Sequence, residues 1–195
     1  MTSESTRQSI VETAAELFWA RSYHGVGVAQ IAAATKVNKA TLYQHFRSKD
    51  ELAQAVVTYN LERTVDCVFE AAMAASEDPD ERLEGIYRRV HAMHVSLERS
   101  GAPARGCPFV NIAMELSLEN DSLREQVADA IERFAGYYRT IVRSLPGRKL
   151  RKAEVDARAS ALVGNMNGAM VASKYQGRPA AILEALPTAL LILHR

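Results

Sequence analysis

Residues 28–50, VAQIAAATKVNKATLYQHFRSKD, decide how the whole chain is interpreted. Apolar residues recur at helical spacing around Ile31 and again around Leu42, which predicts two short helices. The three residues 34–36 between them are too few for a long loop, and Asn38 is a suitable cap for the second helix. The stretch therefore predicts a helix-turn-helix, in which the second helix enters the major groove of DNA.

The charges of this stretch support a polyphosphate partner. Between residues 34 and 49 the charged side chains are all cations, namely Lys36, Lys39, Arg47 and Lys49. Residues 1–50 carry six Lys or Arg against four Asp or Glu, whereas residues 51–195 carry eighteen against nineteen. The net charge of +1 therefore conceals a local basic region, and we expect attraction to phosphate at the N-terminal part only.

Length and composition suit a small DNA-binding domain over 1–50, followed by a larger all-helical domain over 51–195. Residues 1–12 lack the apolar core of a signal peptide, and no later run is long and apolar enough for a membrane span. Two cysteines are too few for a disulfide framework. We expect a cytoplasmic protein with no membrane partner and no cofactor.

Helical periodicity recurs through nearly the whole chain, and no alternating pattern of a strand is convincing. We therefore predict an all-α fold of about nine helices. A helix over about 6–21 precedes the two of the motif, and Ser48 with Glu51 forms a capping box that starts a long fourth helix into the 70s. The remaining helices are expected around 83–97, 109–116, 122–145, 152–175 and 179–193.

The second helix of the motif offers side chains suited to base edges and phosphates. Gln44 is able to pair with adenine, and the Thr41 methyl suits a thymine methyl. Tyr43, His45 and Lys49 are expected nearer to phosphates, although Tyr43 as a core residue and His45 as a solvated one stay open. The candidate DNA-binding residues are Lys36, Lys39, Ala40, Thr41, Tyr43, Gln44, His45 and Lys49.

Residues 10–59 resemble the DNA-binding domain of the TetR family of bacterial transcriptional regulators. The resemblance rests on Ala14, Leu17, Phe18, Gly25, Ile31, Ala32, Val37, Leu42, Tyr43, His45, Phe46, Lys49 and Leu52. It implies a DNA-binding homodimer in which residues 51–195 form the effector-binding and dimerisation domain. Three positions depart from the family pattern: Val26 replaces a usual Thr, Lys36 a usual Gly in the turn, and Ala40 a frequent Gly. If Lys36 is left-handed, the strain is about 1 kcal/mol.

Two C-terminal helices predict a dimer interface. Residues 152–175 carry a stripe of small residues that permits close approach of another helix, with Leu162, Met166 and Met170 toward the opposite side. Residues 179–193 are too apolar for a lone surface helix, and Pro187 is expected to kink them. The predicted interface residues are Ala157, Ala161, Gly164, Gly168, Ala172, Leu183, Leu186 and Leu190. The alternative is that both helices only fill the core of a monomer.

Aromatic, Met and isolated polar residues on core-facing stripes predict a largely hydrophobic effector. The candidates are His94, Cys107, Phe109, Asn111, Met114, Tyr138, Met166 and Met170. Each alone is equally compatible with packing. Cys107 lies at the expected start of a helix beside Arg105, which favours thiolate and suggests an electrophile sensor, with a small inert cysteine as the alternative. His91, His94 and Glu98 share a helix face, a weak metal motif.

These observations favour a ligand-responsive transcriptional regulator that binds a palindromic operator as a homodimer. Repression, with release by a hydrophobic or electrophilic effector, follows from the family resemblance alone. A helical enzyme is the second hypothesis, but the sequence has no nucleophile–base pairing and no phosphate-binding glycine loop. A helical adaptor that has lost DNA binding is the third, because of the three departures.

Overall fold

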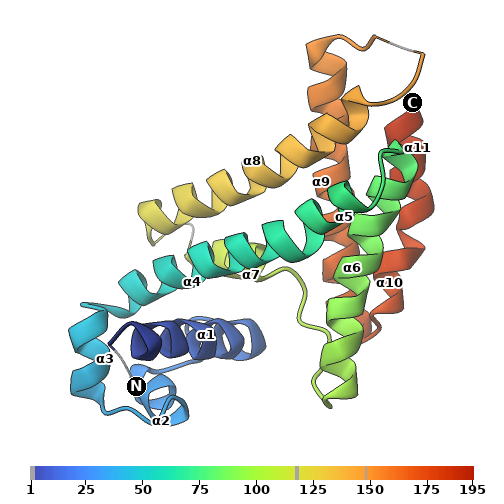
Figure 1. The fold of residues 1–195 in the computed structure, drawn as a ribbon. Helices are drawn as coiled ribbons and strands as arrows, with labels where there is room; N and C mark the ends of the chain where they lie inside the picture. The colour runs from blue at the N-terminus through green and yellow to red at the C-terminus, as the bar shows by residue number, and fades with distance from the viewer. Residues whose placement is uncertain (1–2, 117–118, 148) are drawn as a thin grey trace. The chain divides into compact units, whose positions relative to one another are not determined.

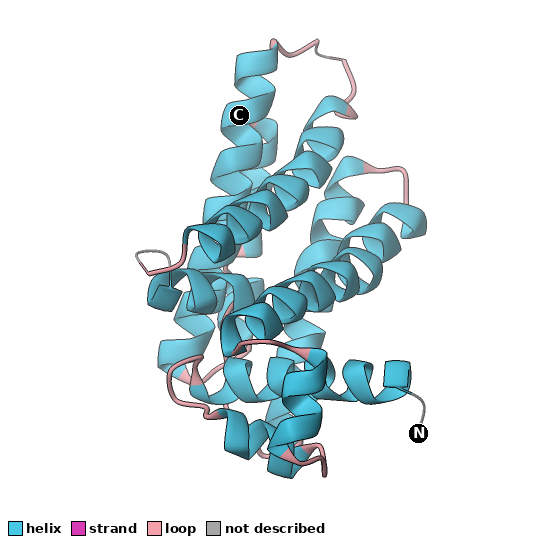
Figure 2. Ribbon diagram, turned by 90° about the vertical axis from the view of Figure 1, so that its left-hand side faces the viewer, coloured by secondary structure: helices cyan, strands magenta, loops and turns pink. Residues whose placement is uncertain are grey.

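The fold is all-helical, as a computed structural model of the chain shows. The structure describes residues 3–116, 119–147 and 149–195, and all regular secondary structure within these ranges is helical (Figure 2). The predicted all-α class is confirmed. The chain forms two compact units, the first made of Met1–Glu62 and Pro108–Asp129, the second of Arg63–Cys107 and Ala130–Arg195.

Three helices form the N-terminal part of the first unit: α1 (Ser3–Arg21), α2 (Val28–Ala34) and α3 (Lys39–His45) (Figure 1). Their shared core contains Ile10, Phe18, Ile31, Leu42 and Phe46, all nearly inaccessible to solvent. The side chain of Asn38 accepts a hydrogen bond from the Thr41 N–H at 2.7 Å, so the predicted cap is confirmed. Gly27 is the N-cap residue of α2.

The turn between α1 and α2 depends on special backbone positions. Ser22, the residue after α1, has a φ of 74° and so adopts the left-handed conformation in which many helices end. At Gly25 an added Cβ would lie 2.2 Å from the carbonyl oxygen of Arg21. Gly25 is therefore required by close backbone approach, and the chain reverses sharply before α2.

A long helical run links the two units along the chain. It comprises α4 (Lys49–Thr64), a π-helical turn η1 (Val65–Glu70) and α5 (Ala71–Ala75), so the predicted fourth helix into the 70s is confirmed. The Ser48 hydroxyl accepts from the Glu51 N–H at 3.1 Å and starts this run. After it, Asp78 caps α6 (Pro79–Arg99) by accepting from two backbone N–H groups.

The first unit also contains α7 (Pro108–Leu116) and the first half of α8 (Asp121–Arg143). Asn120 caps α8 by accepting from the Leu123 N–H at 3.0 Å. The predicted domain boundary at residue 50 is therefore not a boundary between compact units. Residues 51–62 continue the helix that begins at Lys49, and residues 108–129 pack with the N-terminal helices although they lie far away in the sequence.

In the second unit α10 (Ala180–Glu184) and α11 (Leu186–His194) pack against both α6 and α9 (Lys152–Gln176) (Figure 1). α9 ends at Gly177, whose φ is 66°. The predicted last helix is broken between α10 and α11, and the break adjoins Pro187 as expected. Phe69 stacks on Phe134 and Tyr137, which ties η1 to the second half of α8.

Among the described residues, no helix is long and apolar enough to cross a lipid bilayer.

Candidate functional site

The outward face of α3 carries the side chains predicted to contact DNA. Lys39, Ala40, Tyr43 and Gln44 share one face of the helix and are all exposed, while Leu42 points into the core. Tyr43 is 49% exposed, so its interpretation as a core residue is wrong. Thr41 and His45, at the edges of this face, are half-buried. We call the exposed face of Lys39, Ala40, Tyr43 and Gln44 the recognition face.

The cations around the recognition face are available to an external anion. Within the described part of the chain, Lys36, Lys39 and Arg47 are exposed and their side chains form no ion pair. In contrast, two cations at the start of α9, Arg151 and Lys152, pair with carboxylates of their own helix. Net cationic character therefore remains where α3 is exposed, which suits phosphate binding.

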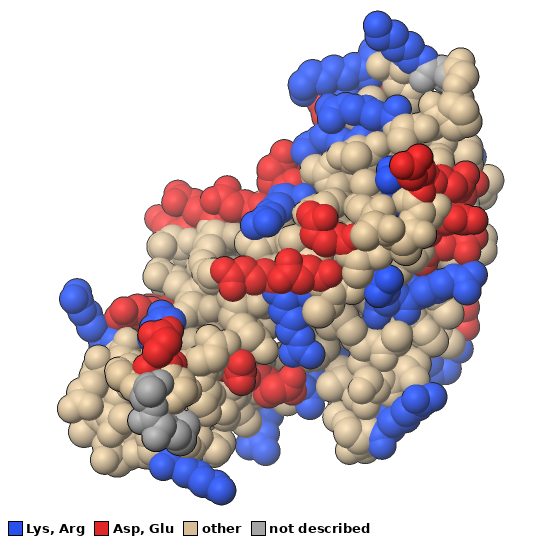
Figure 3. All heavy atoms as spheres, in the orientation of Figure 1, with Lys and Arg blue, Asp and Glu red and all other residues tan. Residues whose placement is uncertain are grey.

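Basic side chains are not confined to the first unit. Figure 3 shows Lys and Arg gathered where α8 ends and α9 begins, and the exposed cations there include Arg143, Lys149, Arg151 and Lys152. This second group contributes four of the eighteen Lys and Arg residues of 51–195. Counting charges along the sequence therefore locates the basic recognition face less well than the local pattern of the motif does.

Lys49 has a structural role that differs from the predicted phosphate contact. Its Nζ donates a hydrogen bond to the carbonyl oxygen of Tyr23 at 2.6 Å and lies 3.9 Å from the centre of the Tyr23 ring. Burial lowers the pKa of this ammonium from its usual value. The predicted role of Lys49 is corrected accordingly, because its ammonium is held inside the first unit by a carbonyl and a ring face.

Lys36 occupies the left-handed position that the turn requires. Its φ is 58°, and its side chain is exposed. The strain expected from a non-glycine residue in this conformation is therefore present, at about 1 kcal/mol. Val26, the second departure from the family pattern, is fully buried and offers nothing to an external ligand.

Lys36→Gly is expected to have opposite effects on folding and on anion binding. Relief of the left-handed strain raises the free energy of unfolding by about 1 kcal/mol. Loss of one cation weakens DNA binding uniformly across sequences. It also reduces the slope of log K against log salt concentration by about one for each protomer, because one phosphate contact is lost. Lys36→Ala is the matched control, because it removes the charge and keeps the strain. Urea unfolding and duplex titrations measure both effects, and equal stability of the two variants would contradict the strain.

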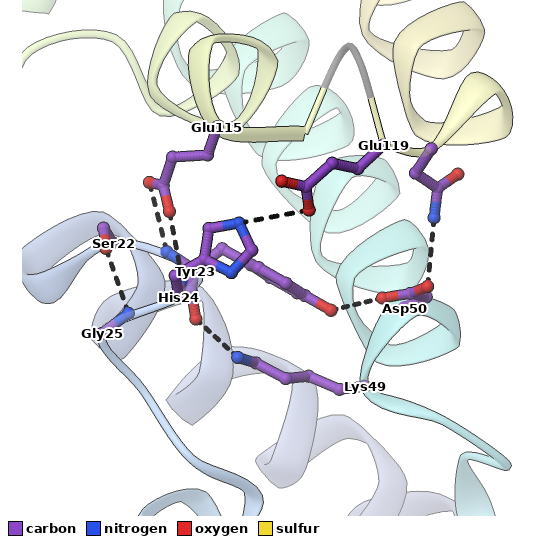
Figure 4. Close-up of polar contacts among 9 residues, drawn as sticks. Ser22, Tyr23, His24, Gly25, Lys49, Asp50, Glu115 and Glu119 are labelled. Carbon is purple, nitrogen blue, oxygen red and sulfur yellow. Dashed lines mark hydrogen bonds and ion pairs between the residues drawn. The ribbon is translucent and has the colours of Figure 1, made fainter.

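A polar network that the sequence did not reveal fixes the turn after α1 (Figure 4). The Glu115 carboxylate, near the end of α7, accepts from the backbone N–H of Tyr23 at 3.2 Å and from that of His24 at 3.0 Å. The Tyr23 hydroxyl donates to Asp50, which also accepts from the Asn120 side chain at 3.2 Å. Burial and the Asp50 carboxylate raise the pKa of Tyr23, so the phenol is neutral.

α9 presents small residues to solvent in the second unit. Ala157, Ala161, Gly164 and Gly168 are exposed, and Ala172 is half-buried. A Cβ added at Gly164 or Gly168 would meet no other atom within 4 Å, so packing within the chain does not require these glycines. On the other side of α9, Leu162, Met166 and Met170 are buried, as predicted.

Large apolar side chains extend this face. Tyr175 is 74% exposed and Leu191 62%, and neither was among the predicted interface residues. Leu183, Leu186 and Leu190, which were, are half-buried. We call the exposed small and apolar residues of α9 and α11 the apolar face; it comprises Ala157, Ala161, Gly164, Gly168, Val171, Tyr175 and Leu191.

The predicted effector residues are divided between the two units. His94, Cys107, Tyr138, Met166 and Met170 belong to the second unit and are buried. Phe109, Asn111 and Met114 lie on α7 in the first unit. Phe109 is buried and Asn111 half-buried, but Met114 is 81% exposed, because it lies on the outer face of α7. The prediction that Met114 lies on a core-facing stripe is wrong.

Cys107 directly precedes α7, as predicted, but it is only 4% exposed. A thiol that reacts with electrophiles needs access to solvent as well as a favourable charge environment. Burial therefore argues for the inert alternative in this conformation. His94 is also buried, and its Nδ1 lies 3.0 Å from the Val90 carbonyl oxygen. Burial lowers the pKa of His94, so its imidazole is neutral.

Two buried phenols, on α6 and α8, and a half-buried amide of α9 interact in the second unit. The Tyr87 hydroxyl donates to Asn165 Oδ1 at 2.6 Å, whereas the buried hydroxyl of neighbouring Tyr138 has no hydrogen-bond partner among the described residues. Burial raises the pKa of both phenols, so both are neutral donors. The sequence singled out Tyr138 but not Tyr87 or Asn165, since only the fold brings these three helices together.

Within the described ranges, no group of three or more His, Cys, Asp or Glu side chains is arranged to hold a metal ion. The weak motif of His91, His94 and Glu98 therefore acquires no further ligand from the rest of the described chain.

Comparison with known proteins identifies both parts of the chain. Residues 10–56 match the pattern of bacterial regulatory proteins of the tetR family, and residues 79–189 match the tetracyclin repressor-like C-terminal domain. The transcriptional regulator LmrA of Bacillus subtilis is 27% identical over 163 residues, which cover 81% of this chain and 82% of that protein. The transcriptional repressor DhaR of Mycobacterium sp. is 27% identical over 175 residues, which cover 87% of this chain and 83% of that protein.

Solved structures agree with these relatives. The crystal structure of a TetR transcriptional regulator from Chloroflexus aurantiacus superposes with a TM-score of 0.81 at 25% identity, covering 99% of this chain and 96% of that one. The similarity thus extends over both the helix-turn-helix and the C-terminal helices.

Proposed function

The chain belongs to the TetR family of bacterial regulatory proteins, and we propose that it represses transcription. In this proposal a homodimer of the chain binds a two-fold symmetric operator. A small effector releases the dimer from the operator. It is a transcriptional regulator with a helix-turn-helix and not an enzyme. Repression is supported by the similarity to DhaR, whose name describes a repressor. The expected location is the cytoplasm, where bacterial chromosomal DNA lies.

The recognition face carries the proposal of operator binding. The face presents an exposed amide, that of Gln44, which is suited to reading a base edge. Exposed cations lie on and beside the face: Lys39 on the helix, Lys36 before it and Arg47 after it. These three cations form no ion pair in the described structure. Arg and Lys supply most of the affinity through phosphates, while a glutamine pairs with an adenine edge. A small molecule would not require this combination on an exposed helix.

The apolar face supports the homodimer. Glycines with open space beside them allow a second helix to approach closely, and the exposed Tyr175 and Leu191 gain free energy if a partner covers them. A second copy of the chain is the natural partner, because a two-fold symmetric interface places two recognition faces for two half-sites.

An effector site is supported by three polar residues of the second unit, the buried Tyr87 and Tyr138 and the half-buried Asn165. Tyr138 presents a neutral hydroxyl without a partner in the described structure, next to the hydrogen-bonded pair of Tyr87 and Asn165. A buried donor without a partner costs free energy in the unliganded protein. An effector with a hydrogen-bond acceptor, such as a carbonyl oxygen, and an otherwise apolar body would satisfy it. The buried Met166 and Met170 supply adaptable apolar side chains on the same helix as Asn165.

Tyr138→Phe and Tyr87→Phe are expected to change stability in opposite directions. Removing the Tyr138 hydroxyl eliminates a buried donor that lacks a partner, so the free energy of unfolding rises by about 1 kcal/mol. Removing the Tyr87 hydroxyl leaves Asn165 Oδ1 without its donor and lowers the free energy of unfolding by about 1–2 kcal/mol. Urea unfolding of both variants measures this, and a similar loss in both would show that Tyr138 is an ordinary, satisfied core residue.

Salt-dependent binding to a selected duplex tests the function. Duplexes enriched on the purified protein from a random pool should contain an inverted repeat, and binding should weaken steeply with salt. With about three cations per protomer near phosphates, the slope of log K against log salt is about −5 for the dimer. An adaptor without DNA binding would enrich no sequence. Transcription in vitro from a promoter that overlaps the repeat then distinguishes repression from activation.

A further inference from the structure

We propose that the Glu115 carboxylate couples α7 to the helix-turn-helix by holding the turn between α1 and α2. Its two hydrogen bonds, to the N–H groups of Tyr23 and His24, are called the Glu115 latch. The latch is a positioning contact for DNA binding and not a part of the recognition face. The inference rests on the proposed function, because it assigns a contact within the first unit that positions the DNA-binding helices.

The chemistry of the latch requires a carboxylate. The backbone N–H groups of Tyr23 and His24 each donate a hydrogen bond to a different oxygen of the Glu115 carboxylate, at 3.2 and 3.0 Å (Figure 4). Hydrogen bonds to an ionised acceptor are stronger than neutral ones. Glu115 is also the second-last residue of α7, where the helix dipole disfavours a negative charge. The two N–H groups of the turn therefore stabilise the negative charge of Glu115, which the dipole of α7 does not stabilise.

The turn between α1 and α2 is also held by residues at the start of α4, in addition to the Glu115 latch. The Tyr23 carbonyl accepts from Lys49 and the Tyr23 hydroxyl donates to Asp50, both at the start of α4. Asn120, which caps α8, donates to the same Asp50 carboxylate. Backbone N–H, carbonyl and side chain of Tyr23 are thus all engaged. A displacement of α7 must move the turn or break the Glu115 latch.

α7 is suited to transmit such a displacement. It is a regular helix that begins at Pro108, and its buried Phe109, Ile112 and Leu116 give it a packed face. Two residues of the predicted effector set, Phe109 and Asn111, lie on this helix, while Glu115 lies at its far end. Along the chain, α7 follows directly on Cys107, the last residue of a segment of the second unit. A displacement of α7 therefore reaches the latch along one continuous helix.

Glu119 provides a matched control. Its carboxylate lies 3.5 Å from the His24 imidazole, and both side chains are more than half exposed. Exposed pairs of this kind contribute little to stability. Glu119→Gln removes the same charge from the same neighbourhood and leaves both backbone hydrogen bonds of the latch intact. Glu115→Gln retains the shape of the side chain but replaces one of the two acceptor oxygens by a donor group, so it can satisfy only one N–H.

The experiment uses the full-length protein and the duplex selected above, with amide hydrogen exchange followed by mass spectrometry. In the free protein, Glu115→Gln should accelerate exchange of the Tyr23 and His24 amides about tenfold. Because coupling between sites is reciprocal, duplex binding to the wild type should slow exchange within 108–116 by about fivefold or more. Glu115→Gln should still bind the duplex but lose this response in α7, whereas Glu119→Gln should retain it.

Three results would overturn the coupling. They are a wild-type α7 that does not respond to the duplex, a Glu115→Gln variant that responds as the wild type does, and a Glu119→Gln variant that loses the response equally. If Glu115→Gln does not fold, Glu115→Asp serves the same test, because it keeps the charge and shortens the side chain so that it no longer spans both N–H groups. Failure of the wild type to bind any duplex would instead refute the proposed function itself.

Discussion

Gly168→Leu is expected to convert the protein into a folded monomer and to weaken operator binding by at least about a hundredfold. A second helix can approach α9 closely only where side chains are small, and a leucine at this position holds the two helix axes apart. Among the described residues, no atom outside the local helix backbone lies within 4 Å of a Cβ added at Gly168, so packing in the protomer leaves room for a side chain there. Once the dimer is lost, each recognition face binds its half-site alone, without the gain of 10²- to 10⁴-fold that linkage typically provides.

Gly136→Leu is the matched control for this prediction. Gly136 is also a helical glycine with no atom within 4 Å of an added Cβ, but it lies on α8 and outside the apolar face. Both substitutions raise helix propensity by a similar amount. Sedimentation velocity gives the oligomeric state and duplex titration gives the affinity. A dimeric Gly168→Leu protein, or equal loss in both variants, would refute the assignment of the interface to α9.

Gln44→Ala is expected to weaken binding to the selected operator by about tenfold to a hundredfold. The amide of Gln44 lies on the recognition face, one turn into α3, where it is able to make a bidentate contact with a base edge. Its loss should also relax the preference at one base pair of each half-site, while the salt dependence stays unchanged because no charge is removed.

Lys36→Gly distinguishes base contact from phosphate contact. It should weaken all duplexes alike and reduce the salt dependence, with no change in the preferred bases. Repeating the duplex selection on both variants measures this difference. If Gln44→Ala enriches the same sequence with the same stringency as the wild type, then Gln44 does not read a base, and the exposed Lys39 becomes the principal candidate.

Local features of the N-terminal part were predictable because each depends on residues that are close in sequence. The Asn38 cap, the Ser48 cap and the apolar positions of α1–α3 require only helical spacing and a side chain that reaches its own backbone. The left-handed Lys36 agrees with the family resemblance, in which a glycine usually occupies this turn position. The break of the last helix next to Pro187 was expected from the local sequence as well.

Three predictions about side chains needed the tertiary structure for their correction. Lys49 belongs to a basic run in the sequence, but the fold brings the Tyr23 carbonyl and ring to it. Cys107 precedes a helix as expected, yet packing buries its thiol. Met114 has the helical spacing of a core residue, but α7 turns it outward. In each case the deciding group lies on another element, which periodicity does not report.

By itself the sequence determined the all-helical class, the helix-turn-helix and the small-residue stripe of α9, since these follow from the order of residues along one helix at a time. Only the tertiary structure decided that residues 108–129 pack with the N-terminal helices and that Glu115 meets the backbone of Tyr23 and His24. The physical reason is that a backbone N–H has the same chemistry at every residue. Its partner is therefore chosen by the packing that brings distant segments together and not by any pattern in the sequence.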